Sequence, residues 1–116
     1  MPQIVIYQKP TCNTCRAVYK ALVEAGVDFQ SIDYFIDAIP KRKLKDLLKK
    51  MGISARQLIR TNEPSYKNLK LAGREYSDDE IIDFMVKYPE LIQRPIVEKG
   101  PRAILARPAE RIKELL

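Results

Sequence analysis

Cys12 and Cys15, the only cysteines of the chain, are separated by two residues at the predicted start of a helix. A cysteine at this place faces the free N–H groups and the positive end of the helix, which stabilise its thiolate. The pKa of such a thiol falls from about 8.5 to roughly 3.5–7.5. The nearby cations Lys9 and Arg16 are expected to add to this effect. The spacing therefore predicts a nucleophilic Cys12, with Cys15 one helical turn later able to resolve a disulfide formed there.

The residues around the two cysteines are typical of a strand, a helix and a second strand. Residues 4–7 form a continuous β-branched and aromatic run, as in a strand buried on both faces. A helix with apolar residues at helical spacing follows and ends at Gly26, and residues 27–34 resemble a second strand. Such a βαβ unit has parallel strands. The position of the cysteines in this unit favours redox chemistry over the alternative, in which both are small buried apolar residues.

The remainder of the chain predicts a helical segment, a β-hairpin and a last helix. The helical segment covers approximately residues 41–90. Its internal boundaries are indicated by capping or breaking residues, namely Gly52, Ser54, Ser77 and Pro89. Residues 95–98 and 102–106 are predicted strands of a hairpin, and Pro108 is suited to the first position of the last helix. We therefore predict a single α/β domain over residues 1–116, in the order βαβ, helical insert, ββα.

The composition excludes several classes of site. The chain has no histidine, which excludes Ser-His-Asp and Cys-His nucleophile systems as they are usually built. Two cysteines cannot supply the four ligands of a tetrahedral zinc site, so we expect no bound metal. The net charge of +6 is concentrated in residues 41–50, a run without any aromatic residue. That pattern is typical of a solvated helix face, and we expect no nucleic-acid partner.

The apolar runs of the sequence are short. The longest contain four residues, at 4–7 and 103–106, whereas a membrane-spanning helix needs about 20. The first three residues lack the basic start of a signal peptide. We therefore expect no membrane association and a cytoplasmic location, where two cysteines are more often catalytic than a structural disulfide.

Several segments of the chain resemble the ArsC-like arsenate reductases, a glutaredoxin-linked family that also includes the Spx transcriptional regulators. The resemblance runs nearly from end to end and is carried by residues 7–12, 51–54, 58–60, 62–63, 83–85, 94–97 and 107–108. It implies a thioredoxin-like α/β fold with an all-helical insert between its two halves, and a monomer. It also implies a cis peptide bond between Arg94 and Pro95.

The same resemblance implies a site for an oxyanion. Cys12 would attack arsenate, and Arg60, Arg94 and Arg107 would surround it. Each arginine stands at the end of a predicted element, where sites are usually built, and arginine offers a fork of donors with a permanent charge. No bound cofactor is expected. Glutathione, glutaredoxin or thioredoxin would return Cys12 to its reduced state.

Three positions separate this chain from parts of that family. Gln8 lies in the region where the reductases often carry a histidine, and Cys15 is more typical of the Spx proteins. Arg107, in contrast, matches the reductases and has no counterpart in the Spx proteins. Two alternatives to an arsenate reductase therefore stay open. One is an Spx-like redox-sensing regulator that binds RNA polymerase, and the other is a general thiol-disulfide oxidoreductase.

Overall fold

The computed structural model describes residues 3–116, which form two compact units. The first unit comprises the chain up to Asp37 together with Arg94–Leu116, and the second comprises Ala38–Gln93. The helical segment expected at residues 41–90 lies within the second unit. That both units act as a single domain remains a prediction.

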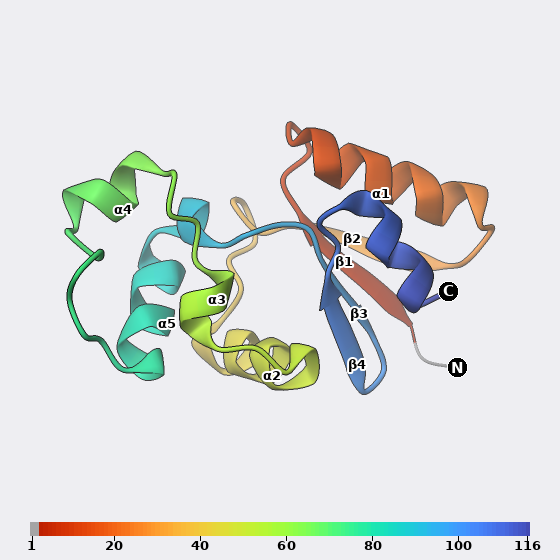
Figure 1. The fold of residues 1–116 in the computed structure, drawn as a ribbon. Helices are drawn as coiled ribbons and strands as arrows, with labels where there is room; N and C mark the ends of the chain where they lie inside the picture. Colours follow the sequence, from red (N-terminus) through yellow and green to blue (C-terminus); the bar gives the residue numbers. More distant parts are fainter. Residues whose placement is uncertain (1–2) are drawn as a thin grey trace. The chain divides into compact units, whose positions relative to one another are not determined.

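The first unit is built on a four-stranded sheet in the order β2-β1-β3-β4 (Figure 1). Its strands are β1 (Ile4–Gln8), β2 (Phe29–Asp33), β3 (Ile96–Lys99) and β4 (Arg102–Leu105). β1 and β2 are parallel, as the predicted βαβ unit requires, and Ile4 pairs with Phe29. β3 is antiparallel to both β1 and β4, which confirms the predicted hairpin.

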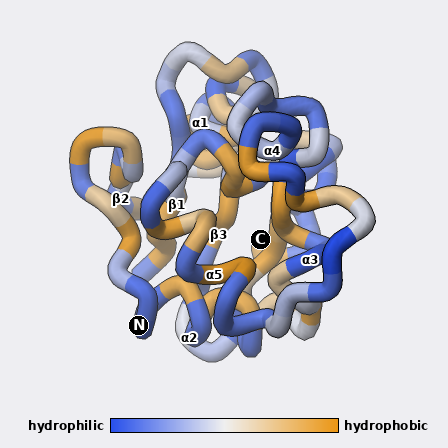
Figure 2. Tube along the Cα trace, turned by 90° about the vertical axis from the view of Figure 1, so that its left-hand side faces the viewer, coloured by the Kyte–Doolittle hydropathy of each residue, from blue (hydrophilic) through white to orange (hydrophobic). Residues whose placement is uncertain are grey.

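One face of this sheet is covered by α1 (Asn13–Glu24) and by the 3-10 helix η2 (Ala109–Glu114). The trace of α1 includes both hydrophobic and hydrophilic residues (Figure 2). Val18 and Leu22 of α1 and Ile112 of η2 are buried, so both elements present apolar side chains to the core. The buried cluster consists of Ile4, Ile6, Val18, Leu22, Val97, Ile104, Ala106, Ile112 and Leu115. Full burial of a side chain such as Leu22 contributes roughly 1.5–3 kcal/mol. The cluster therefore holds the N-terminus of α1 against the end of β1.

The second unit consists of helices joined by short loops. They are α2 (Lys41–Met51), α3 (Ala55–Leu58), α4 (Pro64–Asn68), α5 (Asp78–Lys87) and the 3-10 helix η1 (Pro89–Leu91). The basic run of α2 is partly neutralised by α5, since Lys41 lies 2.9 Å from Asp79 and 2.8 Å from Asp83. Lys45 lies 2.7 Å from Asp79 as well. These pairs support the interpretation of the basic run as a solvated helix face.

Several predicted element boundaries differ from the observed ones by one or two residues, and two of the differences have a clear structural cause. The second strand begins at Phe29, because Gly26 has a positive φ of 68° and the next residues complete the turn out of α1. The last helix is a 3-10 helix in which Pro108 is the N-cap and not the first helical residue. The Arg107–Pro108 peptide bond is cis, a feature that the sequence did not suggest.

Replacement of Ser77 by Ala is expected to lower the free energy of unfolding by about 1 kcal/mol. The Ser77 hydroxyl accepts a hydrogen bond from the Glu80 N–H at 3.2 Å, and Glu80 accepts one from the Ser77 N–H at 3.1 Å. Ser77→Ala breaks the first bond and leaves an N–H of α5 without its cap. Urea unfolding followed by circular dichroism measures the loss. Ser77→Asp keeps an acceptor, so a loss as large as that of the Ala variant would contradict this account.

Candidate active site

Cys12 is the N-cap residue of α1, at the junction that the sequence predicted. A tight turn places it there, because the Cys12 N–H donates to the Lys9 carbonyl at 2.9 Å. The Arg16 N–H then donates to the Cys12 carbonyl at 3.0 Å, which starts the helix. Both cysteines are free thiols, and Cys12 is partly exposed whereas Cys15 is fully buried. The accessible sulfur at this junction is therefore that of Cys12.

The environment of Cys12 favours its thiolate. Partial burial raises the pKa of this thiol, but three neighbours outweigh burial and lower the pKa to about 7. They are the backbone N–H of Cys15, the thiol of Cys15 and the guanidinium of Arg94. Near neutral pH, Cys12 is therefore ionised and nucleophilic to a much larger extent than an ordinary cysteine.

Cys15 has the opposite character. Burial raises the pKa of Cys15 to about 12, and the neighbouring Cys12 thiolate adds to the rise. The Cys15 thiol therefore keeps its proton and can donate it in a hydrogen bond to the Cys12 sulfur. The two thiols therefore differ in pKa, so that Cys12 is the nucleophile and Cys15 is the neighbour that keeps its proton.

Arg94 brings a buried cation to the Cys12 sulfur. Only 8 % of this residue is exposed, and its Nε and Nη1 atoms have no hydrogen-bond partner among residues 3–116. Burial lowers the pKa of Arg94, but contacts with Tyr34 and Cys12 outweigh this effect and raise the pKa. The guanidinium also lies 5.8 Å from the ring centre of Phe35. Buried donors without partners are costly, so these two N–H groups are suited to an anion beside Cys12.

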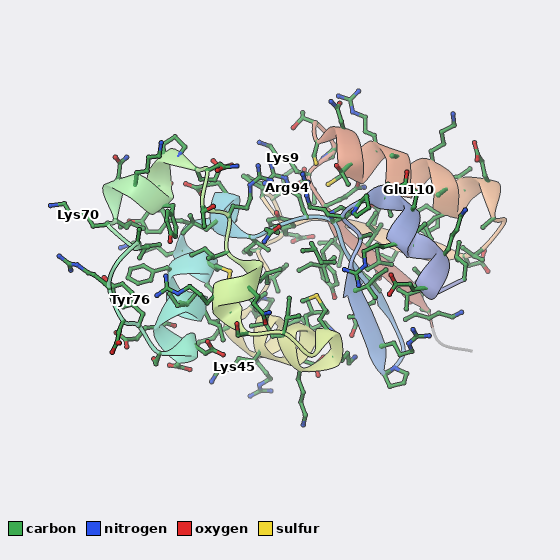
Figure 3. The ribbon with its side chains drawn as sticks, viewed as in Figure 1. Lys9, Lys45, Lys70, Tyr76, Arg94 and Glu110 are labelled. Carbon is green, nitrogen blue, oxygen red and sulfur yellow. The ribbon has the colours of Figure 1, made fainter. Side chains whose placement is uncertain are left out.

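The cations Lys9 and Arg94 share the ring of Phe35. The Lys9 ammonium lies 4.7 Å from its centre, and Figure 3 shows both cations near the start of α1. Phe35 is a residue of this site that the sequence did not reveal, because it follows β2 and no motif marks it. A cation–π contact stabilises the cation by about 0.5–1 kcal/mol at an exposed position.

Arg107 is joined to the same loop. Its Nη1 donates to the Arg94 carbonyl at 3.1 Å, and the Ala106 N–H donates to the Pro95 carbonyl at 2.9 Å. The Arg94–Pro95 peptide bond is cis, which confirms the prediction. The hairpin thus places Arg107 beside the main chain of Arg94.

Comparisons with known proteins identify the family and the fold of this chain. The family model described as "ArsC family" matches residues 7–115. The chain belongs to the ArsC family. It is 38 % identical to the arsenate reductase of Escherichia coli (strain K12), over the whole of this chain and 82 % of that protein. An arsenate reductase from Vibrio cholerae has the same fold, with a TM-score of 0.94, 34 % identity and coverage of 99 % of this chain and 98 % of that one.

Another relative of similar identity carries no named activity. The uncharacterized protein YfgD of Escherichia coli (strain K12) is 37 % identical over 98 % of this chain and 97 % of its own length. The structural likeness assigns the thioredoxin-like fold of the ArsC family to this chain, as predicted.

In this ArsC-family chain, Arg60 belongs to the second unit. It follows α3, its N–H donates to the Leu91 carbonyl at 2.7 Å, and its Nε lies 3.1 Å from a carboxylate oxygen of Glu63. That ion pair lacks the alignment of a hydrogen bond. The role of Arg60 at the oxyanion remains a prediction.

Lys9 and Arg16, which the sequence suggested, are not among the groups with the largest effect on the Cys12 pKa. The cation that lowers this pKa is Arg94, which is distant in sequence and reaches the site through the pairing of β3 with β1. The Arg16 guanidinium donates to the Thr11 carbonyl, at 3.5 Å. Gln8, in the place of the family's histidine, is buried and donates through Nε2 to the Ser31 hydroxyl.

The described part of the chain, residues 3–116, contains no cluster of three or more His, Cys, Asp or Glu side chains suited to a metal ion. None of its helices has the length and apolar character needed to cross a bilayer.

Alkylation of Cys12 by iodoacetamide is expected to accelerate between pH 6 and pH 8, with its midpoint near pH 7. The Cys12 pKa is lowered to about 7, so the reactive thiolate is lost as the pH falls through this value. The rate is measured by mass spectrometry of the native chain, on samples quenched at successive times. Cys15 is buried with a raised pKa and should react only after unfolding. A midpoint near 8.5, or equal reaction of both cysteines, would contradict the site described here.

Proposed function

We propose that this ArsC-family chain reduces arsenate to arsenite with Cys12 as the nucleophile. The observation that carries the proposal is the pair of unpartnered N–H donors on Arg94, a residue only 8 % exposed that contacts the Cys12 sulfur. A tetrahedral oxyanion beside Cys12 would accept hydrogen bonds from both donors. The named activity of the Escherichia coli and Vibrio cholerae relatives supports arsenate as that oxyanion.

The first step forms a bond between Cys12 sulfur and arsenic. The thiolate attacks As(V), and one arsenate oxygen leaves as water after taking protons from the substrate's own hydroxyl groups and from solvent. No histidine is present to act as the acid. Because arsenic stays As(V) in this step, the second thiol performs the reduction.

The second step breaks the sulfur–arsenic bond. A second thiolate attacks the Cys12 sulfur, a disulfide forms, and the electron pair of the broken bond stays on arsenic. Arsenic is thereby reduced from As(V) to As(III), and arsenite leaves after protonation. Two thiols are oxidised to one disulfide, which accounts for both electrons.

The arginines act on the charge of the oxyanion. Arg94 offers the two unpartnered donors, and we assign Arg107, whose Nη1 is bonded to the Arg94 carbonyl, to the same anion. Arg60 is proposed as the third cation on the basis of the family resemblance alone. Fixed charged donors of this kind stabilise the charge that develops as the oxygen leaves.

The second thiol has two proposed sources. Cys15 is the neighbour whose thiol faces the Cys12 sulfur, and it can resolve the adduct within the chain if its proton passes to an arsenate oxygen as it attacks. Glutathione, glutaredoxin or thioredoxin is the external alternative, and one of these must also reduce the final disulfide. The cycle as proposed needs no bound cofactor and no second copy of the chain. We therefore propose a monomer that acts in the cytoplasm, where reducing conditions keep both cysteines as free thiols.

A coupled assay with arsenate tests the proposal. Oxidation of NADPH is followed with glutathione, glutaredoxin and glutathione reductase, and separately with thioredoxin and thioredoxin reductase. We expect NADPH oxidation that depends on arsenate with at least one system. Absence of such oxidation with both systems, from a chain whose Cys12 is free and reactive, would contradict the proposed function.

A general thiol-disulfide oxidoreductase is the second candidate. The lowered pKa of Cys12 beside the protonated Cys15 favours it, since these thiols suit disulfide exchange on any substrate. Exchange activity that survives the loss of Arg94, in a chain without arsenate turnover, would support this candidate over the first.

A further inference from the structure

Phe35 lies in the turn that follows β2, and its ring meets the two cations Lys9 and Arg94. We propose that Phe35 is a positioning residue, whose ring fixes the plane of the Arg94 guanidinium beside the Cys12 sulfur. The inference rests on the proposed function in one respect only, namely that the anion bound by Arg94 is arsenate. The contact between Arg94 and the Cys12 sulfur needs no anion, so it can be tested separately.

Hydrogen bonds alone leave the orientation of the Arg94 side chain poorly defined. Its Nε and Nη1 atoms have no hydrogen-bond partner among residues 3–116, so hydrogen bonds fix at most one of its three nitrogens. A guanidinium held through one nitrogen can turn about that atom, whereas it donates to an oxyanion in pairs only when its plane is fixed. The Phe35 ring supplies the second support, because its centre lies 5.8 Å from the guanidinium carbon, within the reach of a cation–π contact.

The Phe35 ring is itself held by two neighbours. The ring of Tyr34, a fully buried residue, lies 5.2 Å from the Phe35 ring between centres. The Lys9 ammonium lies 4.7 Å from the centre of the Phe35 ring. Figure 3 shows Lys9 and Arg94 near each other, although they are distant in sequence. Phe35 therefore gathers two positive charges at the start of α1, where an oxyanion would approach Cys12.

The turn that carries Phe35 is defined by its main chain. The Phe35 N–H donates to a carboxylate oxygen of Asp33 at 3.0 Å. The N–H groups of Ile36 and Asp37 donate to the Asp33 carbonyl, at 3.0 Å and 2.8 Å. None of these bonds involves the Phe35 ring, and the residue is 37 % exposed. A substitution of Phe35 should therefore leave the turn intact, so that its effect reports on the contacts of the ring.

The pH profile of Cys12 alkylation by iodoacetamide tests this role without arsenate. Arg94 is one of the groups that lower the Cys12 pKa, so a guanidinium that turns away from the sulfur moves the midpoint of the profile to higher pH. Phe35→Leu keeps an apolar side chain but removes the ring, whereas Phe35→Tyr keeps the ring. Ile36→Ala is the matched control, because it shortens the next side chain of the same turn at a position that is 85 % exposed.

We expect Phe35→Leu to raise the midpoint by about 0.3–0.7 pH units, a two- to fivefold change in the ionisation constant that corresponds to the loss of one cation–π contact. Phe35→Tyr and Ile36→Ala should keep the midpoint of the unmodified chain. When Arg94→Ala is already present, Phe35→Leu should cause no further shift, because no guanidinium is left for the ring to hold.

Two results of the alkylation experiment overturn the proposal. One is an unchanged midpoint in Phe35→Leu. The other is a shift by Phe35→Leu that is as large in the Arg94→Ala chain as in the unmodified one, since Phe35 would then act on Cys12 without Arg94. Circular dichroism of each variant verifies that the fold is retained.

The KM for arsenate tests the same role at the oxyanion. Phe35→Leu should raise this KM about two- to fivefold and change kcat less, while Phe35→Tyr restores it. An unchanged KM in a chain that reduces arsenate overturns the proposal as well. A chain without arsenate turnover contradicts the proposed function alone, and the alkylation midpoint then decides the role of Phe35.

Discussion

Cys12→Ser is expected to abolish arsenate reduction with every reductant, a loss of at least a thousandfold. A serine hydroxyl is not ionised near neutral pH, whereas the pKa of Cys12 is lowered to about 7. Serine also forms no disulfide, so it cannot supply electrons to arsenic. Coupled NADPH oxidation with the glutaredoxin and thioredoxin systems measures the loss. Residual turnover above the rate without protein, with either system, would contradict the role of Cys12.

Cys15→Ser is the matched variant, since it removes the other sulfur of the same helix. If Cys15 resolves the adduct, this variant loses thioredoxin-supported turnover but keeps activity with glutathione and glutaredoxin. The unmodified chain should then show an internal Cys12–Cys15 disulfide after turnover, detected as a loss of about two mass units. Full activity of Cys15→Ser with both systems would instead leave Cys15 as a buried packing residue.

Arg94→Ala is expected to lower arsenate turnover at least tenfold. A hydrogen bond to a charged group contributes about 1.5–3 kcal/mol, and Arg94 has two unpartnered donors to offer. The same change raises the pKa of Cys12, because Arg94 is one of the groups that lower it. Turnover is therefore compared at pH 9 and divided by the ionised fraction of Cys12, which the iodoacetamide reactivity of each protein across pH gives.

Two further variants distinguish the loss of an arginine at the site from the loss of a positive charge elsewhere on the chain. Arg107→Ala should also lower turnover at least tenfold and leave the alkylation rate at pH 9 close to that of the unmodified chain. Arg102→Ala removes the same charge from an exposed position on β4 and should have little effect. Unchanged turnover in both Arg94→Ala and Arg107→Ala would contradict the assignment of these arginines to the oxyanion.

The elements of the first unit could be predicted because local patterns determine them. Local structure is specified without distant partners by the β-branched run at residues 4–7 and by the apolar spacing of α1. The same is true of Gly26, a residue that readily adopts the positive φ found there. The position of Cys12 at the N-cap follows from the same patterns. The capping box at Ser77 and the cap at Ser54 could be predicted for the same reason, since each depends on residues at most three positions apart.

The neighbours of Cys12 could not be predicted in the same way. Arg94 reaches the sulfur only because β3 pairs with β1, and strand order is a property of the whole sheet. Sequence proximity instead suggested Lys9 and Arg16, and neither is among the groups with the largest effect on the Cys12 pKa. The contact of Phe35 with Lys9 and Arg94 depends on the same topology. Family resemblance identified Arg94, although it gave no account of how Arg94 acts on the thiol.

A single-turnover experiment tests the central claim, that the Cys12 thiolate reduces arsenate. The chain is fully reduced, freed of reductant and mixed with arsenate, either alone or with glutathione, and arsenite is then quantified beside the thiol state of each cysteine. The account predicts up to one arsenite per chain in at least one arm, formed in step with the loss of the free Cys12 thiol and absent from Cys12→Ser. If no arsenite forms in either arm while Cys12 remains a free thiol, the account is contradicted.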